Sequence, residues 1–173
     1  MKWFQLFTII LITMSTNAQN IHELTYTSID GELVSMKSYE DQYVLVVNVA
    51  SFCGYTSQYN ELQELHDSSD RLKVVAFPCN QFGSQEPNSE SEIKSFCSSK
   101  FSVNFPMSSK VDVKGSQVSP IYNWLTSGDL NKLGDFEVSW NFNKFLVGPK
   151  GDLIAYYPSS VNPMSNEITK HIK

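Results

Sequence analysis

The sequence predicts an α/β fold: a central sheet whose inner strands are parallel and whose two faces both carry helices. Two short apolar runs, 43–50 and 72–77, are rich in β-branched residues, as in strands that are buried on both faces. A segment of helical composition follows each run, and an apolar hairpin and a short helix come later. This order favours a sheet with parallel strands and helices on both sides.

The elements expected in the first half of the chain are a hairpin over 22–29 and 32–35, a strand over 44–50, a helix over 57–69, a strand over 72–77 and a helix over 90–100. The hairpin is expected because Asp30-Gly31 is a strong tight-turn pair. The first helix carries Tyr59, Leu62 and Leu65 at helical spacing, which gives it an apolar face.

The second strand is expected to end at Pro78, because proline has no N–H to donate to a strand ladder. Turn-forming residues fill 79–89, and Ser89 or Ser91 is expected to cap the next helix. The later elements are a short strand over 110–113, a helix over 120–126, a polar loop through Asp135, a hairpin over 143–147 and 153–157, and a short helix from about Ser165.

Length and composition are those of one globular domain. The chain has 173 residues, of which 41% are hydrophobic and 18% are charged, and no repeat or charge block divides it. The net charge is −5 and the sequence has no cluster of Lys and Arg. A phosphate-binding surface, and with it a nucleic acid partner, is therefore not expected.

The first eighteen residues have the pattern of a secretory signal peptide. Lys2 supplies a positive charge, 3–14 is mostly apolar and uncharged, and Thr16-Asn17-Ala18 offers small residues for cleavage. The apolar run is too short for a comfortable membrane span, and an uncleaved anchor is the alternative. We expect a signal peptide over 1–18 and one exported domain over 19–173, periplasmic or secreted.

The three cysteines, Cys53, Cys79 and Cys97, cannot all pair with one another. An exported chain with so few cysteines is expected to use them for redox chemistry rather than for disulfide staples. The chain has no Cys-x-x-Cys of a dithiol oxidoreductase and no Cys-x-x-x-Cys of a copper-delivery protein. Its three histidines are scattered without ligand spacing, so no metal site is expected.

Cys53 lies where the buried strand over 44–50 gives way to the helix over 57–69. A thiol at that junction is close to the positive end of a helix dipole and to free backbone N–H groups. Both favour the thiolate, which is the reactive form. The alternative is a buried structural cysteine, a common fate of this residue type.

Three segments together resemble the glutathione peroxidase family. They are Asn-Val-Ala-Ser-Phe-Cys-Gly-Tyr-Thr at 48–56, Phe-Pro-Cys-Asn-Gln-Phe-Gly-Ser-Gln-Glu-Pro at 77–87, and Trp-Asn-Phe-Asn-Lys-Phe-Leu-Val at 140–147. The resemblance covers the chain from about residue 20 onward. It implies a thioredoxin-like fold, with a central mixed sheet flanked by helices and an N-terminal β-hairpin.

By this resemblance the catalytic residues are Cys53, Gln85, Trp140 and Asn141, and the substrates are hydrogen peroxide and organic or lipid hydroperoxides. The chemistry suits these residue types. Cys53 attacks the peroxide, while the two amides and the indole N–H donate hydrogen bonds to the thiolate and to the developing oxyanion. No cofactor is implied. Without the resemblance, Gln85 and Asn141 would be ordinary loop residues and Trp140 a core or surface aromatic.

The resemblance also implies how the enzyme is recycled. Cys97 matches the resolving cysteine of the thioredoxin-dependent members, which attacks the Cys53 sulfenic acid and forms a disulfide. If an intact helix holds Cys97 away from Cys53, that helix has to unwind locally, because a disulfide requires Cα atoms within roughly 7 Å. Thioredoxin, or a thioredoxin-like protein, is the first choice of reductant and glutathione the second. Cys79 is expected to be structural or a minor backup.

The loop over 127–139 is short, which resembles the monomeric branch of the family with its open site. Two other functions are alternatives; the first uses the same residues and stays open, and the site residues argue against the second. A peroxide sensor or redox relay would pass the Cys53–Cys97 disulfide to a client protein. A non-enzymatic interaction module would have no need of Gln85, Trp140 and Asn141 together.

Overall fold

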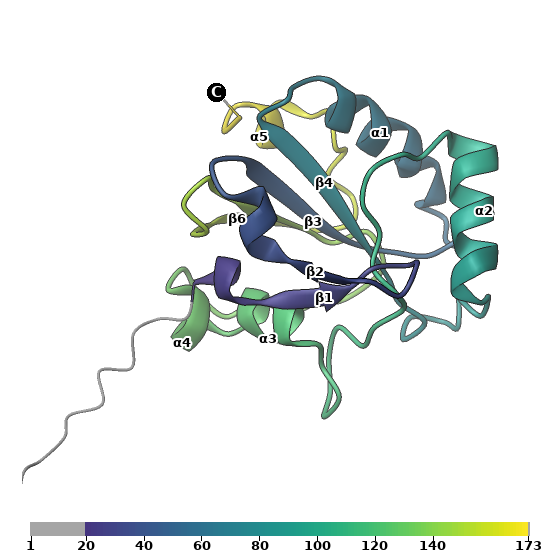
Figure 1. The fold of residues 1–173 in the computed structure, drawn as a ribbon, viewed down its shortest axis with the longest axis horizontal. Coiled ribbons are helices and arrows are strands. Elements are labelled where there is room, and N and C mark those ends of the chain that lie inside the picture. The colour runs from purple at the N-terminus through teal and green to yellow at the C-terminus, as the bar shows by residue number, and fades with distance from the viewer. Residues whose placement is uncertain (1–19, 173) are drawn as a thin grey trace, which may run out of the picture.

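The computed structural model describes residues 20–172 and is built around a four-stranded mixed sheet (Figure 1). Its strands are β3 (Tyr43–Val49), β4 (Leu72–Pro78), β5 (Lys144–Val147) and β6 (Leu153–Tyr157), in the spatial order β4-β3-β5-β6. β3 runs parallel to β4, whereas β3 with β5 and β5 with β6 are antiparallel.

The mixed sheet is confirmed, but the expectation that its inner strands are parallel is wrong. The inner pair, β3 and β5, is antiparallel, and the parallel partner β4 lies outside β3. The backbone N–H of Asn48 donates to the carbonyl of Asn143. Since this contact fixes the start of β5 at the carboxyl end of β3, β5 has to run back along β3.

Helices cover both faces of the sheet, as expected. They are α1 (Tyr59–Asp67), α2 (Glu90–Phe101), α3 (Pro120–Thr126), α4 (Gly128–Asn131) and α5 (Asn166–Thr169), with 3-10 turns η1 (Ile21–Glu23), η2 (Met36–Tyr39) and η3 (Thr56–Gln58). Along β3, Leu45 and Val47 pack with residues of α1, α2 and α5. Val44 and Val46 point the other way and pack with α3 and the N-terminal segment.

The N-terminal hairpin is confirmed, although its strands are shorter than predicted. β1 (Thr25–Thr27) pairs antiparallel with β2 (Leu33–Ser35) as a separate two-stranded sheet. The start of the predicted strand is instead the turn η1, because the Asn20 side chain accepts the His22 N–H and caps a 3-10 helix there.

The strand predicted over 110–113 does not form. The chain before it runs beside the outer edge of β4, where Ala76 donates to the carbonyl of Pro106 and accepts from Ser108. The next residue of β4 that faces this edge is Pro78, which has no N–H. Beyond Ala76, the only hydrogen bond between this segment and β4 among the described residues runs from the Val111 N–H to the Pro78 carbonyl. A strand ladder over 110–113 therefore does not form.

The helix predicted over 57–69 begins as η3 and continues as α1, and the predicted polar loop through Asp135 contains the short helix α4. α2 begins at Ser89, the first of the two predicted caps, in a capping box with Glu92. The remaining helices and the second hairpin lie where the sequence places them.

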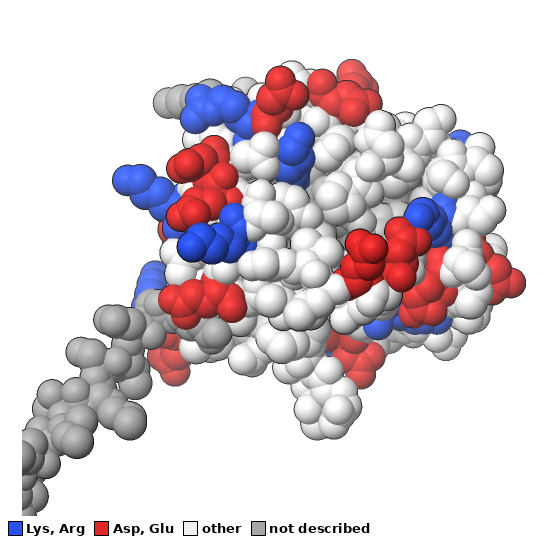
Figure 2. Space-filling view, viewed as in Figure 1, with Lys and Arg blue, Asp and Glu red and all other residues white. Residues whose placement is uncertain are grey.

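Within residues 20–172, no helix is long and apolar enough to cross a membrane. The predicted signal peptide over 1–18 lies outside the described residues. On the face shown in Figure 2, Lys and Arg are interspersed with Asp and Glu and form no continuous basic surface.

Candidate active site

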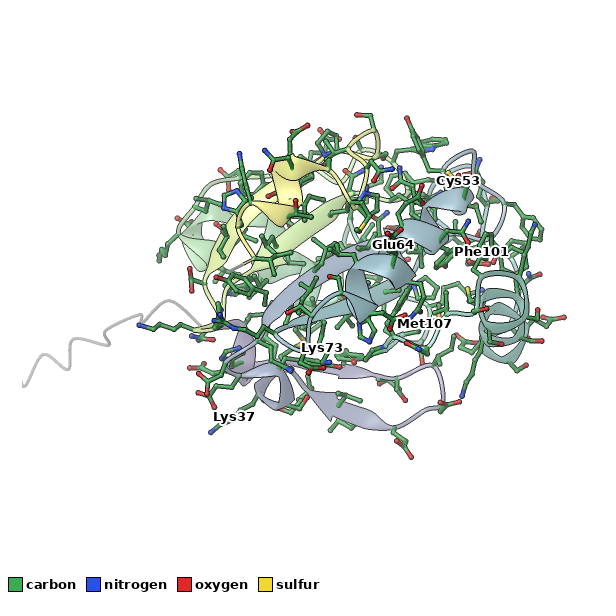
Figure 3. All side chains as sticks on the ribbon, turned by 90° about the horizontal axis from the view of Figure 1, so that it is seen from above. Lys37, Cys53, Glu64, Lys73, Phe101 and Met107 are labelled. Atoms are coloured by element: carbon green, nitrogen blue, oxygen red, sulfur yellow. The ribbon has the colours of Figure 1, made fainter. Side chains whose placement is uncertain are left out.

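Cys53 lies in the turn that joins β3 to η3, and its side chain is half-buried. Figure 3 shows it at the end of the molecule where α1 begins. The turn is fixed from within: Thr56 Oγ1 accepts the Cys53 N–H at 3.0 Å and donates to the carbonyl of Ala50 at 2.9 Å. The junction of strand and helix predicted for Cys53 is therefore confirmed.

The Cys53 sulfur has a backbone donor beside it. The N–H of Tyr55 points to Sγ, with the nitrogen at 3.5 Å. The backbone of the turn that follows Cys53 therefore contacts the sulfur directly.

Gln85 reaches this turn from the loop that follows β4. Its carbonyl accepts the N–H of Phe52, the residue before Cys53, at 3.1 Å. Its side-chain Oε1 accepts from Asn141 Nδ2 at 3.0 Å. Three segments far apart in the sequence therefore meet here. This pairing uses the Gln85 side-chain oxygen and one N–H of Asn141, whereas the Asn141 Oδ1 is buried without a partner among the described residues.

Asn141 is completely buried, and Trp140, beside it in the chain, is 39% exposed. The Trp140 ring packs on Phe82, with ring centroids 5.9 Å apart. Phe52 is 58% exposed and Tyr55 36%, on the two sides of Cys53 in the chain. The exposed surface next to the nucleophile is thus largely aromatic, with Lys100 over Phe96 and Lys114 over Phe82 at its margins.

Asn48 fixes the turn of Trp140 and Asn141, a role that was not predicted from the sequence. Its Nδ2 donates to the Trp140 carbonyl at 2.9 Å, and its Oδ1 accepts the Asn143 N–H at 3.0 Å. Its backbone carbonyl accepts the N–H of Phe142 at 2.6 Å. A signal was present, since a buried amide in an otherwise apolar strand needs dedicated partners.

Glu86, next to Gln85, is a second buried polar residue to which no role was assigned. Its Oε2 accepts from the Ser51 hydroxyl at 3.0 Å, and its Oε1 has no hydrogen-bond partner among the described residues. Burial raises the pKa of this carboxyl, and the bond from Ser51 opposes the rise. The Glu86 charge in turn contributes to the raised pKa of Cys97.

Cys97 lies in α2 on the same side of the sheet as Cys53, but it is completely buried and not bonded to Cys53. Burial raises the pKa of its thiol to about 11, against a smaller opposite effect of the Tyr59 hydroxyl. The two cysteine segments contact each other through Phe52 and Phe96, with ring centroids 6.3 Å apart. The structure is thus the dithiol form, with Cys97 held in an intact helix.

Cys79 is buried on the opposite side of the sheet, in the cluster that includes α3. Its sulfur accepts from the Gln81 N–H at 3.5 Å, and burial raises its pKa. The structure does not bring it together with Cys53 or Cys97. Within the described part of the chain, no group of three His, Cys, Asp or Glu side chains is placed to hold a metal ion.

Comparisons with known proteins give consistent results. A family model described as glutathione peroxidase matches residues 21–126. The chain is 42% identical over 152 residues to the chloroplast phospholipid hydroperoxide glutathione peroxidase 1 of Arabidopsis thaliana, covering 86% of this chain and 64% of that protein. It is 40% identical over 158 residues to the hydroperoxy fatty acid reductase gpx1 of Synechocystis, covering 87% and 94%.

The crystal structure of Trgpx in its apo form superimposes with a TM-score of 0.69 at 32% identity, covering 89% of this chain and 95% of that one. This likeness over nearly the full length of both chains confirms the expected thioredoxin-like fold. The chain spans just under two thirds of the Arabidopsis protein's length.

Proposed function

The chain belongs to the glutathione peroxidase family, and we propose that it is a thiol peroxidase whose nucleophile is Cys53. The observation that carries the proposal is the contact between Asn141 Nδ2 and Gln85 Oε1, together with the bond from Phe52 to Gln85. These contacts join the two amides to the segment of the reactive thiol. They support the proposal that these amides donate hydrogen bonds to the peroxide oxygen that receives negative charge.

In the first step, the Cys53 thiolate attacks the terminal oxygen of a hydroperoxide. An S–O bond forms as the O–O bond breaks, so the sulfur is oxidised to the sulfenic acid and the peroxide is reduced to an alcohol, or to water. The leaving alkoxide takes up one proton. Gln85, Asn141 and the Trp140 indole donate hydrogen bonds to the charge that moves between sulfur and oxygen.

Lipid hydroperoxides fit the surface beside Cys53. Phe52, Tyr55 and Trp140 offer exposed aromatic rings that an acyl chain can cover. The Arabidopsis and Synechocystis relatives are named for reducing phospholipid and fatty acid hydroperoxides. We therefore propose organic and lipid hydroperoxides as substrates beside hydrogen peroxide.

In the second step, the Cys97 thiolate attacks the sulfenic sulfur of Cys53. An S–S bond forms and water leaves, so the enzyme becomes a disulfide. Because Cys97 is buried in α2 and burial disfavours its thiolate, this step requires α2 to open. A dithiol protein such as thioredoxin then reduces the disulfide and becomes oxidised itself; glutathione is the second candidate.

The protein is further proposed to be a monomer and to be exported by cleavage after residue 18. The short loop over 127–139 and the signal-like pattern of 1–18 support these two statements. Light scattering of the purified domain gives its mass. N-terminal sequencing of the protein from the exported fraction would identify Gln19 as the first residue if cleavage occurs there.

The decisive experiment is steady-state turnover of residues 19–173 with hydrogen peroxide and a thioredoxin system, and separately with glutathione. Cys53→Ser abolishes turnover with both reductants, and Cys97→Ser abolishes turnover with thioredoxin. Ser116→Ala, an exposed loop substitution, serves as the matched control. Turnover that survives Cys53→Ser contradicts the proposal. Stoichiometric oxidation of a client protein without turnover would indicate the sensor instead.

A further inference from the structure

A buried hydrogen-bond network joins the segment after Cys53 to the turn of Trp140 and Asn141, and Ser159 lies at its centre. Ser159 follows β6 and is 7% exposed. Its hydroxyl donates to the Asn141 carbonyl at 2.6 Å and accepts from Asn143 Nδ2 at 2.7 Å. Both partners belong to the turn that presents the proposed oxyanion donors.

The backbone carbonyl of Ser159 contacts the segment that follows Cys53. It accepts from Gln58 Nε2 at 2.8 Å and from Lys144 Nζ at 3.4 Å. Gln58 ends the 3-10 turn that directly follows the Cys53 turn. One buried residue therefore contacts both segments of the site, through different atoms.

The turn that these hydrogen bonds hold contains a residue in a strained backbone conformation. Phe142 has φ 64°, a left-handed conformation that is strained for a residue with a β-carbon. Lys144 Nζ donates to its carbonyl at 2.8 Å. Small changes in this turn are passed directly to Asn141, whose amide contacts Gln85.

We propose that Ser159 is a positioning residue for peroxide reduction, with its hydroxyl fixing the turn of Trp140 and Asn141 and its carbonyl fixing the segment that follows Cys53. The inference rests on the proposed peroxidase function, because the atoms that it places are the proposed donors and nucleophile. Ser159 itself does not touch the peroxide.

The test compares three substitutions in the domain over 19–173. Ser159→Ala removes the hydroxyl and keeps the carbonyl, Ser159→Thr keeps both, and Ser160→Ala makes the same change at the exposed neighbour. The rate constant of Cys53 oxidation by hydrogen peroxide is measured by stopped flow. The rate of Cys53 alkylation by iodoacetamide is measured in parallel, because alkylation needs the thiolate but no oxyanion donors.

Ser159→Ala is expected to oxidise about tenfold more slowly, less than the roughly 10²–10³-fold loss on removing an oxyanion donor outright. The alkylation rate of Ser159→Ala is expected to match that of the wild type. Ser159→Thr is expected to recover most of the oxidation rate, and Ser160→Ala is expected to change neither rate. Hydrogen exchange of the peptide over 138–145 gives a readout independent of peroxide, and only Ser159→Ala should accelerate it.

Two further outcomes distinguish a failure of the Ser159 proposal from a failure of the proposed peroxidase function. A wild type that reacts with peroxide, beside a Ser159→Ala variant that reacts and exchanges equally fast, overturns the inference alone. A wild type that reacts no faster than free cysteine overturns the function, and hydrogen exchange then decides whether Ser159 positions the turn.

If Ser159→Ala does not fold, Gln58→Met replaces it. Gln58 Oε1 already lacks a partner among the described residues, so the substitution removes mainly the bond to Ser159. Slower oxidation with unchanged alkylation supports the role of Ser159. Unchanged oxidation in this variant contradicts it.

Discussion

At the scale of single residues, the site depends on side chains that hold backbone atoms. Asn48 forms hydrogen bonds with the backbone of Trp140, Phe142 and Asn143, and Lys144 donates a hydrogen bond to the Phe142 carbonyl. The left-handed Phe142 persists because these surrounding bonds stabilise it. Its conformation leaves Asn141 buried and in contact with Gln85, which would hold the proposed amide donor in position before a peroxide binds.

Asn141→Ala is expected to lower the rate constant of Cys53 oxidation by about 10²–10³-fold, since it removes an oxyanion donor and leaves Gln85 Oε1 without its partner. The backbone contact of Asn141 with Ser159 remains, so the fold is kept. Stopped-flow oxidation by hydrogen peroxide measures the effect. Asn60→Ala, on an exposed position of α1, is the control, and equal rates in the two variants would contradict the role.

Lys144→Met tests a buried charge beside the site. Burial lowers the pKa of Lys144 to about 7 from 10.5, and the charge of Glu61 only partly opposes this. Between these values the unfolded chain binds a proton that the native state has lost, so the contribution of Lys144 to stability rises with pH.

Below pH 7 the unfavourable burial of the charge is fully present. The free energy of unfolding of the wild type, relative to Lys144→Met, should therefore increase between pH 7 and 10 with a slope of at most about 1.4 kcal/mol per pH unit. Urea unfolding of both proteins over this range measures it. Parallel stability curves would mean that Lys144 titrates normally in the fold.

At the scale of elements, α2 combines features that hold it with features that loosen it. A capping box of Ser89 and Glu92 fixes its start, and Lys94 pairs with Asp30 of the hairpin turn at 2.6 Å. That ion pair is more than half exposed and contributes little. Exposed serines weaken the middle and the end of the helix. A helix of this kind can open locally while the sheet remains folded.

Stabilising α2 should slow the resolving step alone. Ser95→Ala with Ser99→Ala raises helix propensity by roughly 0.5 kcal/mol each, which predicts about fivefold slower Cys53–Cys97 disulfide formation. The first oxidation of Cys53 should keep its rate. Rapid quench with alkylation and peptide mass spectrometry measures both steps.

The opposite change supplies the control for this prediction. Ser89→Ala removes the cap and is expected to destabilise α2 by about 1 kcal/mol, so that disulfide formation becomes about fivefold faster. Rates that do not respond to either variant would show that α2 opening does not limit resolution.

The helices and strands were predictable where one local pattern decides. β3 and β4 are apolar and β-branched, and α2 and α3 begin at capping serines. The predictions that were wrong concern segments whose structure depends on residues distant in sequence. The segment over 110–113 has strand composition, but Pro78 on the neighbouring edge cannot donate to it.

At the scale of the whole molecule, topology explains why three motifs converge. Cys53 follows β3 and Gln85 follows β4, and parallel strands end at the same edge of a sheet. β5 runs antiparallel to β3, so the turn of Trp140 and Asn141 before it lies at that edge too. The family motifs give these residues, whereas Ser159 could not be predicted, because its role depends on a contact across 101 positions to Gln58.

The exposed aromatic rings beside Cys53 bear on the reductant. Phe52 and Tyr55 offer a surface that a protein dithiol can cover when it docks. We expect Phe52→Ser to lower kcat/KM for thioredoxin about tenfold, through lost apolar contact. Oxidation of Cys53 by hydrogen peroxide should be unchanged, because the bond to Gln85 uses the backbone of Phe52. NADPH-coupled turnover measures the first effect and stopped flow the second. A wild type that turns over equally well with glutathione, or a variant slowed equally in both steps, would contradict docking of a protein reductant at this surface.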